Sequence, residues 1–283
     1  MVTPRSRMTI NEIKQKQDLF LEQNNLSTAF YRSRCDWNEL IRIGEHFESQ
    51  RCRYTDLVQG YLSEIASFEH IHSYRHRIKE TESLLKKIID KTDEKGEPIT
   101  LDNYRVKITD LIGIRVLYVF KSDYYPIHEQ IWKRFEHQTV ENIHIKLREG
   151  DDKSIYDKIL KHDPVIEPNS VYRSIHYTVY VDEKNLHDAR LEIQTRTIFE
   201  EGWSEVNHNL IYKNENYYDL SFILGNASKI LSALVGECDS LSELMKGIHD
   251  KYAQKLSDNE NSDNKITDPD MILQDVVRDF LQK

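Results

Sequence analysis

The chain has 283 residues, of which 39% are hydrophobic and 31% are charged, and its formal net charge at pH 7 is −9. This length suits one large domain, or one domain with helical additions. The negative charge argues against broad, non-specific binding of nucleic acid, although a local basic patch could still bind a nucleotide or an RNA end.

The sequence shows no membrane segment, no signal peptide and no paired cysteines, and these features bear on the cellular compartment of the protein. No apolar run approaches the length that crosses a bilayer, and the polar stretch Met1–Asn25 has no signal-peptide core. The three cysteines, Cys35, Cys52 and Cys238, lie far apart and show no C-x-x-C spacing. They fit free thiols in a reducing compartment better than disulfides or a zinc site. We therefore expect a cytoplasmic protein without a membrane segment.

The first 70 residues predict helices. Met8–Asn25 reads as a polar helix with a thin apolar stripe, and apolar residues recur at helical spacing from about Trp37 to Ser67. Neither segment contains a group of residues that we can assign to chemistry. We expect both to serve packing and assembly.

The middle of the chain alternates strands with helices. The predicted strands are Ile71–Lys79, Leu111–Phe120, Thr139–Leu147, Val171–Val181 and Ala189–Thr197. The predicted helices are Glu80–Asp90, Thr100–Lys107, Pro126–His137 and Ile198–Tyr212. Asp93–Pro98 is a turn-rich break, and the charged segment Arg148–Pro168 predicts a loop with a short helix at Ser154–Leu160.

The C-terminal part predicts a long amphipathic helix, Leu220–Tyr252, followed by a polar linker, Ser257–Asp268, and a short amphipathic helix, Pro269–Leu281. Three glycines are expected to bend the long helix or to end segments of it: Gly225, Gly236 and Gly247.

Two carboxyl groups accompany the predicted strands. Asp110 directly precedes the strand that starts at Leu111, and Glu192 lies between apolar neighbours in the strand Ala189–Thr197. Two acids near the same end of neighbouring strands repel each other, and a divalent cation such as Mg²⁺ relieves this repulsion. The alternative is structural: Asp110 caps a strand and Glu192 pairs with a nearby arginine.

Basic residues that suit the binding of phosphate groups surround these acids in the sequence. They are Arg75, Arg77, Lys79, Lys86, Lys87 and Arg115. Arg115 is the most informative, because it interrupts an apolar strand, where an unpaired charge is costly. An internal ion pair of Arg115 with Asp110 or Glu192 explains it equally well, and the lysines also fit a solvated helix face.

Tyr172 and His176 are four residues apart in one predicted strand, so we expect them on the same face. Tyr172 could stack on a base, and His176 could donate to a phosphate. An aromatic core residue beside a hydrogen-bonded histidine remains the alternative, and core packing is expected for Trp203.

Five segments together resemble the synthetase domain of the RelA/SpoT family, which makes the alarmones ppGpp and pppGpp. They follow the family's order and spacing over Ile71–Lys213. The segments are Arg77–Ser83 with Lys87, Thr109–Val116, Tyr172–His176, Leu191–Thr197 and Trp203–His208.

This resemblance implies an α/β (α+β) fold, with a nucleotidyltransferase-like mixed β-sheet flanked by helices and with N- and C-terminal helical extensions. The implied division is an N-terminal extension at 1–70, a synthetase domain at 71–213, a helical extension at 214–256, and a linker with a short helix at 257–283. Too few residues precede the match for an upstream hydrolase domain, so we expect a stand-alone small synthetase.

The resemblance also implies Mg²⁺-dependent transfer of pyrophosphate from ATP to the 3′-hydroxyl of GDP or GTP, with AMP leaving. Asp110 and Glu192 would hold Mg²⁺, and Glu192 would help to remove the proton from the attacking hydroxyl. Tyr172 would stack on the acceptor base, with His176 and Gln194 nearby. The residues expected to contact ATP are Arg77, Lys79, Ser83, Lys87 and Arg115.

The sequence departs from the family pattern in two places. Pro168–Val171 stands where the family usually has Lys-x-Asn-Gly, and Asn207 stands where an acidic residue commonly precedes the histidine. Both changes bear on the acceptor more than on the donor. Three alternatives therefore stay open: a toxic relative that pyrophosphorylates the 3′-CCA end of tRNA, a synthetase of (p)ppApp, and a catalytically silent nucleotide sensor.

Partner expectations concern the C-terminal helices. Leu220–Tyr252 has enough apolar surface to support a homo-oligomer, and the family resemblance implies a dimer or tetramer. The short helix Pro269–Leu281 would alternatively bind an antitoxin or another partner.

Overall fold

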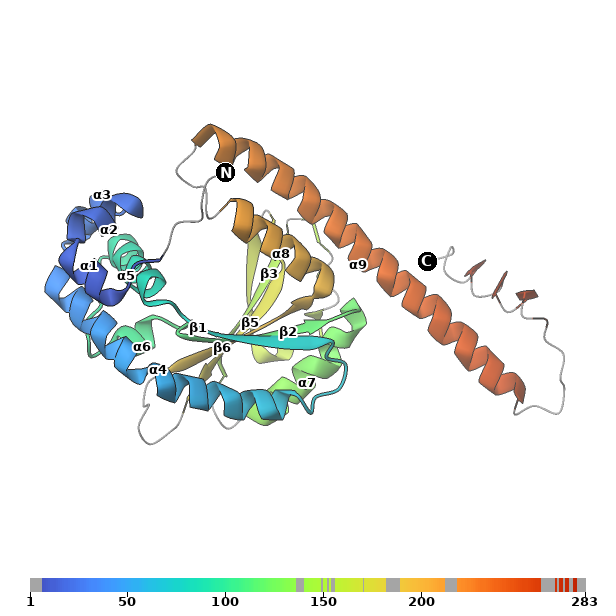
Figure 1. Cartoon of the computed structure of the whole chain (residues 1–283). Coiled ribbons are helices and arrows are strands. Elements are labelled where there is room, and N and C mark those ends of the chain that lie inside the picture. Colours follow the sequence, from blue (N-terminus) through green and yellow to red (C-terminus); the bar gives the residue numbers. More distant parts are fainter. Residues whose placement is uncertain are drawn as a thin grey trace.

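Figure 1 shows the computed structural model of the protein, which has a central β-sheet with helices on both faces. It describes residues 7–135, 140–148, 150, 151, 153, 156–169, 171–181, 189–211, 218–260, 268, 270, 271, 273, 274, 277 and 278. Among these residues, no helix combines the length and the apolar character that a membrane span requires.

The sheet has six strands in the order β1-β2-β6-β5-β3-β4. The strands are β1 (Ser73–Ile78), β2 (Ile112–Tyr118), β3 (Val140–Arg148), β4 (Val165–Asn169), β5 (Ser174–Tyr180) and β6 (Arg190–Thr197). The pairs β2–β6 and β3–β4 are parallel, and the other three pairs are antiparallel. This arrangement confirms the predicted mixed sheet with flanking helices.

The α-helices comprise α1 (Ile10–Gln15), α2 (Gln17–Gln23), α3 (Ser27–Ser33), α4 (Trp37–Ile65), α5 (Thr81–Lys95), α6 (Tyr104–Lys107), α7 (Tyr124–Phe135), α8 (Ile198–Leu210) and α9 (Tyr218–Glu260). Short 3₁₀ turns occur at η1 (Lys121–Asp123) and η4 (Leu160–His162).

One face of the sheet is apolar because alternate side chains of each strand point to it. Ile114, Ile145, Tyr177 and Ile193 on this face are each at most 1% exposed. Helices α4 and α7 cover it, and the ring of His128 on α7 lies within hydrogen-bond distance of the Tyr177 hydroxyl, at 3.0 Å. The opposite face carries polar side chains and lies towards α8 and α9 (Figure 1).

The N-terminal helices differ from the prediction. Met8–Asn25 forms two helices, because the chain leaves the helical conformation at Lys16 (φ −132°, ψ 55°). The break lets Ile13 on α1 and Phe20 on α2 both reach the core, where neither is exposed. Helix α3, which the sequence analysis did not predict, packs against α5.

Helix α5 is longer than the predicted Glu80–Asp90. It continues into the segment expected to be a break and ends where Gly96 adopts a positive φ of 66°. Glycine adopts this left-handed conformation without steric cost, so it ends helices effectively.

The prediction of a loop at Arg148–Pro168 was wrong. Val165–Asn169 forms the edge strand β4, which pairs in parallel with β3. Pro168 lacks an N–H donor, but an edge strand tolerates this because one side of it is unpaired. Of the short helix expected at Ser154–Leu160, Ser154 and Ile155 lie outside the described residues. The described remainder forms turns that lead into the 3₁₀ turn η4 at Leu160–His162.

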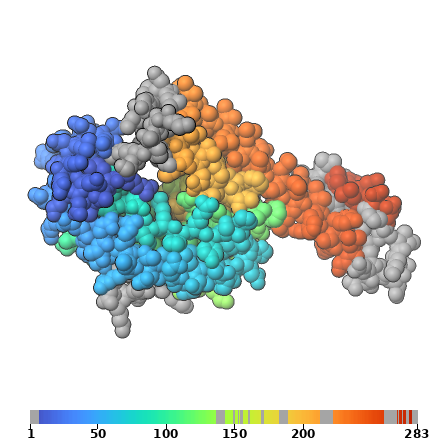
Figure 2. Space-filling view, viewed as in Figure 1, coloured from blue at the N-terminus to red at the C-terminus, as the bar shows by residue number. Residues whose placement is uncertain are grey.

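The three glycines do not interrupt α9, which is continuous from Tyr218 to Glu260. The predicted linker Ser257–Asp268 is therefore helical over its first four residues, and Asn261–Thr267 lie outside the described residues. Of the predicted helix Pro269–Leu281, the described residues are helical. Figures 1 and 2 show that the C-terminal half of α9 projects beyond the sheet and its flanking helices.

Helix α9 is attached to the sheet through a partly buried arginine. The Arg173 guanidinium donates to the Ser232 backbone oxygen on α9 at 3.0 Å, to Glu200 on α8 at 2.9 Å, and to both oxygens of Asp151 at 2.6 and 2.8 Å. Gly236 makes room for this group, because a Cβ atom at Gly236 would lie 2.8 Å from Arg173 Nη2.

We therefore expect Gly236→Ala to lower the free energy of unfolding by about 1–2 kcal/mol, since the clash outweighs the gain in helix propensity. Gly225→Ala is the matched control: it lies in the same helix, has open space around its Cα, and should stabilise the protein by about 0.4–1 kcal/mol. Chemical denaturation measures both values, and a stabilising Gly236→Ala would contradict the packing of Arg173.

Candidate active site

The polar face of the sheet brings distant segments into one row. The backbone pairings place Arg77 of β1 beside Gly113 of β2, Gly113 beside Glu192 of β6, and Glu192 beside Thr178 of β5. Gly113 has no side chain to separate its neighbours, and the Arg77 side chain passes over it. The next row joins Arg115, Gln194 and His176 in the same way.

Asp110 lies just before β2 and gathers the basic residues from β1 and α5. Its Oδ2 atom is 2.7 Å from Lys79 Nζ, 2.9 Å from Lys87 Nζ and 3.7 Å from Arg77 Nη2. Three cations therefore surround one carboxylate, which leaves local positive charge on an acidic protein. Four predicted site residues are brought together here.

Burial opposes ionisation of Asp110, but the ammonium groups of Lys79 and Lys87 outweigh it and lower the pKa of Asp110 to about 2. Burial also lowers the pKa of Lys79, against the pull of Asp110, and the neighbouring charges of Lys87 and Arg77 lower it further. The second oxygen of Asp110, Oδ1, is buried and has no hydrogen-bond partner among the described residues.

Glu192 accepts hydrogen bonds on both of its oxygens. His176 Nδ1 lies 3.2 Å from Oε1, and Gln194 Nε2 lies 2.6 Å from Oε2. Burial and the charge of Asp110 favour the neutral acid, but the contacts with His176 and Gln194 prevail and keep the pKa of Glu192 below its ordinary value. Glu192 is therefore a carboxylate at pH 7, and it interacts electrostatically with Asp110.

Tyr172 was predicted to lie in the strand, but it lies just before β5. Its side chain still reaches His176. The Tyr172 hydroxyl is 3.3 Å from His176 Nε2, and the two rings meet edge to face at 5.9 Å. Arg196 Nη2 donates to the same hydroxyl at 2.6 Å and to Gln194 Oε1 at 2.7 Å. Together with Glu192, these residues close a ring of hydrogen bonds.

Arg115 has other partners than those considered in the sequence analysis. Its Nη1 atom is 2.7 Å from Glu201 and 3.3 Å from Glu205, both on α8, and no contact with Asp110 or Glu192 is found among the described residues. Glu201 also lies 3.8 Å from Arg75 and 3.6 Å from Arg196. Helix α8 therefore supplies the counter-charge for the arginines of the polar face.

Ser83 stands apart from the other predicted residues. It is exposed in the first turn of α5, whereas Lys87 lies one turn further along the same helix and reaches Asp110. Arg196 and Glu201 are residues of this face that the sequence analysis did not assign. The alternation Glu192, Gln194, Arg196 was the available signal for Arg196, because every second residue of a strand shares a face.

Trp203 is buried on α8, as expected for a core residue, and it also borders this site. Its ring centroid lies 6.0 Å from that of Tyr172, and its indole nitrogen donates to the Ser228 backbone oxygen on α9 at 3.0 Å. The position of Tyr172 is thus related to the packing of both α8 and α9.

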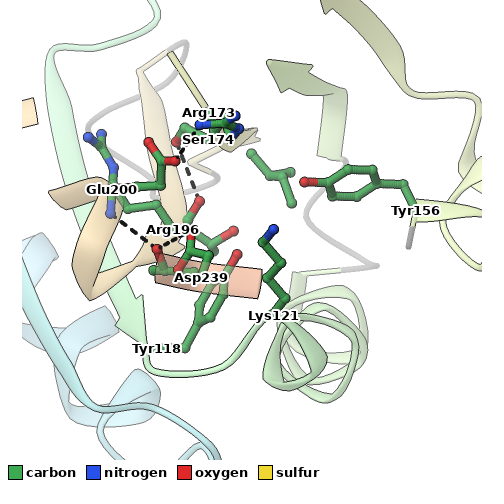
Figure 3. A pocket seen from close by; sticks show the side chains of 11 residues that line it. Tyr118, Lys121, Tyr156, Arg173, Ser174, Arg196, Glu200 and Asp239 are labelled. Atoms are coloured by element: carbon green, nitrogen blue, oxygen red, sulfur yellow. Dashed lines mark hydrogen bonds and ion pairs between the residues drawn. The ribbon is translucent and has the colours of Figure 1, made fainter. Parts of the chain in front are cut away.

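A small cavity of about 30 Å³ is lined by residues of β6, α8 and α9, including Arg196. Figure 3 shows the side chains that surround it. Glu200 and Asp239 line it, and each has a buried carboxylate oxygen without a hydrogen-bond partner among the described residues. Burial raises the pKa of Glu200 to about 7 and that of Asp239 to about 6. A cavity of this size holds about two water molecules.

Comparison with known proteins identifies the family. A sequence model described as "Region found in RelA / SpoT proteins" matches residues 76–217, half of the chain. A curated relative, GTP pyrophosphokinase YwaC of Bacillus subtilis (strain 168), is 26% identical over 185 residues, which are 64% of this chain and 77% of the relative.

One solved structure supports the same fold. The crystal structure of small alarmone synthetase 1 from Bacillus subtilis matches with a TM-score of 0.54 and 18% identity, and it covers 72% of this chain and 97% of that one. A structure of that synthetase bound to its product pppGpp matches with a TM-score of 0.41 and 20% identity, over 65% of this chain and 82% of that one.

The fold and the matched region define a transferase of the GTP pyrophosphokinase type. The chain belongs to the RelA/SpoT family, so the resemblance seen in the sequence is confirmed.

The raised pKa values of the buried acids Asp239 and Glu200 should make their contribution to the free energy of unfolding fall as the pH rises. The native pKa values of Asp239 and Glu200, about 6 and about 7, lie above the ordinary values of 3.8 and 4.5. The native state thus holds protons that the unfolded state has released, so these two groups make the free energy of unfolding decline between roughly pH 4 and pH 7, whereas His128, whose pKa burial lowers to about 4, acts in the opposite direction.

We expect Asp239→Asn and Glu200→Gln each to reduce this decline, as measured by urea unfolding at several pH values across that range. Glu237→Gln removes an exposed carboxyl group from α9 and should leave the wild-type slope unchanged. Identical slopes in all four proteins would show that neither buried acid holds a proton.

Proposed function

We propose that this protein is a Mg²⁺-dependent pyrophosphokinase, which transfers the β,γ-pyrophosphate of ATP to the 3′-hydroxyl of GDP or GTP and so makes (p)ppGpp. The observation that carries the proposal is the arrangement around Asp110 and Glu192. Cations gather beside the first carboxylate, and an aromatic and hydrogen-bonding group gathers beside the second.

The donor side is the cation cluster. A triphosphate needs several positive charges, and Arg77, Lys79 and Lys87 supply three within 3.7 Å of one carboxylate oxygen. Arg115 would add a planar group that can bind phosphate with two nitrogens once it leaves Glu205. Ser83, in the first turn of α5, would donate its hydroxyl close to the helix N-terminus, which is a favourable place for an anion.

The acceptor side is the Tyr172 ring and its neighbours. The side chain is partly exposed, and in this proposal the exposed part of its ring receives the base, while His176 and Gln194 lie beside it on the polar face. A base stacked on Tyr172 places its ribose towards Glu192 in this proposal. The reacting hydroxyl and the donor phosphates would then meet between the two carboxylates.

The residues fit a magnesium ion. Mg²⁺ binds through one or two carboxylates and completes its shell with phosphate oxygens and water. Asp110 and Glu192 are both ionised, and Oδ1 of Asp110 is buried without a partner among the described residues, as expected for an atom that awaits a ligand. When bound, Mg²⁺ would neutralise developing charge on the transferred phosphates.

Glu192 would take the proton from the 3′-hydroxyl of the acceptor while the oxygen of this hydroxyl attacks the β-phosphorus of ATP. The bond between the β-phosphorus and the oxygen that bridges the α- and β-phosphates breaks, and AMP leaves with the electron pair of that bond. Lys79, Lys87 and Arg77 hold the phosphates in line, because transfer of this kind depends mainly on alignment and charge stabilisation.

Incubation of the purified protein with γ-³²P-labelled ATP and one acceptor at a time tests the proposal. Label on GDP or GTP supports it. Label only on the 3′ end of tRNA or only on adenine nucleotides would establish one of the alternatives, and the absence of any transfer would indicate a nucleotide sensor.

Glu192→Gln should lower kcat by at least about a hundredfold, because the amide cannot accept the proton. Its melting temperature should stay near that of the wild type, since the amide keeps the shape of the side chain. Glu237→Gln, an exposed position on α9, should have wild-type turnover. Near-normal turnover of Glu192→Gln would contradict its role as base.

Tyr172→Ala should raise the KM for the acceptor by about ten- to a hundredfold, since stacking on a base contributes about 1–3 kcal/mol. The KM for ATP should change less than about twofold, because the contacts that Tyr172 makes with His176, Arg196 and Trp203 lie on the proposed acceptor side. Steady-state kinetics with each substrate varied separately give both values, and equal effects on the two would count against stacking on the acceptor.

A further inference from the structure

The ring of hydrogen bonds on the polar face has one direction. Arginine nitrogens only donate, so Gln194 Oε1, which lies 2.7 Å from Arg196 Nη2, accepts, and Gln194 Nε2 donates to Glu192 Oε2 at 2.6 Å. The Tyr172 oxygen accepts from the same Arg196 nitrogen, so the Tyr172 hydroxyl hydrogen is directed to His176 Nε2, and His176 Nδ1 carries the hydrogen that faces Glu192 Oε1 at 3.2 Å. This requirement fixes the tautomer of the histidine and the orientation of the amide.

The remaining hydrogens follow from these two. His176 Nε2 accepts from the Tyr172 hydroxyl at 3.3 Å. The Tyr172 oxygen and Gln194 Oε1 then each accept from Arg196 Nη2, at 2.6 and 2.7 Å. This nitrogen carries two hydrogens, one for each acceptor. Two chains of donors thus start at one nitrogen of Arg196 and end on the two oxygens of Glu192.

Arg196 also supports the aromatic ring. Its guanidinium carbon lies 5.0 Å from the centroid of the Tyr172 ring, within the distance of a cation–π contact. The side chain is almost completely buried, and its Nε and Nη1 atoms have no hydrogen-bond partner among the described residues. Nη1 lies 3.6 Å from the Glu201 carboxylate.

Burial of the Arg196 guanidinium lowers the stability of the folded protein when no other role is considered. Desolvation opposes the charge of Arg196, and the repulsion from Arg115 adds to this effect. Buried donors without acceptors cost further stability. The contacts that Arg196 does make as a donor all lead to proposed site residues, so its position is better explained by the site than by packing.

We propose that Arg196 is a positioning residue for the transfer reaction: through Tyr172 it holds the ring that receives the acceptor base, and through Gln194 and His176 it orients both oxygens of Glu192. This inference rests on the proposed function. It differs from a merely structural role, in which Arg196 would only balance the charge of Glu201.

Arg196→Lys and Arg196→Met separate the two roles. Lysine keeps the positive charge but lacks the flat fork that serves the ring and the amide together, and methionine removes the charge as well. We expect both variants to raise the acceptor KM by about tenfold and to lower kcat, with the ATP KM changed less than about twofold. Full rescue by lysine would overturn the proposal and leave a charge-balancing role.

A double-mutant cycle tests whether Arg196 acts through Tyr172. Tyr172→Phe removes the hydroxyl and keeps the ring, so Arg196→Lys should change the acceptor KM less in this background than in the wild type. Independent, multiplicative effects of the two substitutions would show that the residues act separately. Arg196→Met provides a second variant if the lysine fails to fold.

A measurement without turnover separates this inference from the proposed function. In protein labelled with 3-fluorotyrosine, the ¹⁹F signal that disappears in Tyr172→Phe belongs to Tyr172. We expect Arg196→Lys to shift or broaden this signal. A control variant, Lys246→Met, removes a distant cation on α9 and should leave the signal unchanged.

An unchanged Tyr172 signal in the Arg196 variants would overturn the positioning role even in an active enzyme. Failure of the wild-type protein to transfer pyrophosphate to any acceptor would instead overturn the proposed function, whatever the ¹⁹F spectra show.

Discussion

The parallel pairing of β2 with β6 is the constraint on which the rest of the site depends. It brings Gly113 beside Glu192, and so places the segment that begins at Asp110 next to the second carboxylate. Because the two strands are far apart in the sequence, only the sheet can join them. The antiparallel neighbours β1 and β5 then add their own side chains to the same face, one bringing cations and the other bringing His176.

The charges on this face are balanced by groups that a ligand can replace. Lys79 and Lys87 are held by Asp110, and Arg115 is held by Glu201 and Glu205 on α8. Buried ions need partners in the free protein, and these ion pairs meet that need while keeping the cations in position. Under the proposed function, triphosphate binding would exchange one set of anionic partners for another, so folding of the chain would already have placed these cations for the ligand.

The acceptor side of the site is tied to the C-terminal helices. Arg173, which follows Tyr172 in the chain, contacts both α8 and α9, and Trp203 packs between Tyr172 and Ser228. The close approach of α9 to Arg173 depends on Gly236. Changes in the docking of α9 are therefore expected to reach the acceptor side before the cation cluster at Asp110.

The sequence by itself determined the strands, most helices and the family, because alternating and helical periodicities and five spaced motifs are local properties of the chain. It also predicted Asp110, Glu192 and the basic residues as a group. It missed α3 and β4, whose stability comes from packing against α5 and pairing with β3. The partners of Arg115 and the role of Arg196 depended on where α8 lies and on which side chains the sheet register brings within hydrogen-bond distance. Those are relations between distant segments, which no local pattern records, so only the tertiary structure decided them.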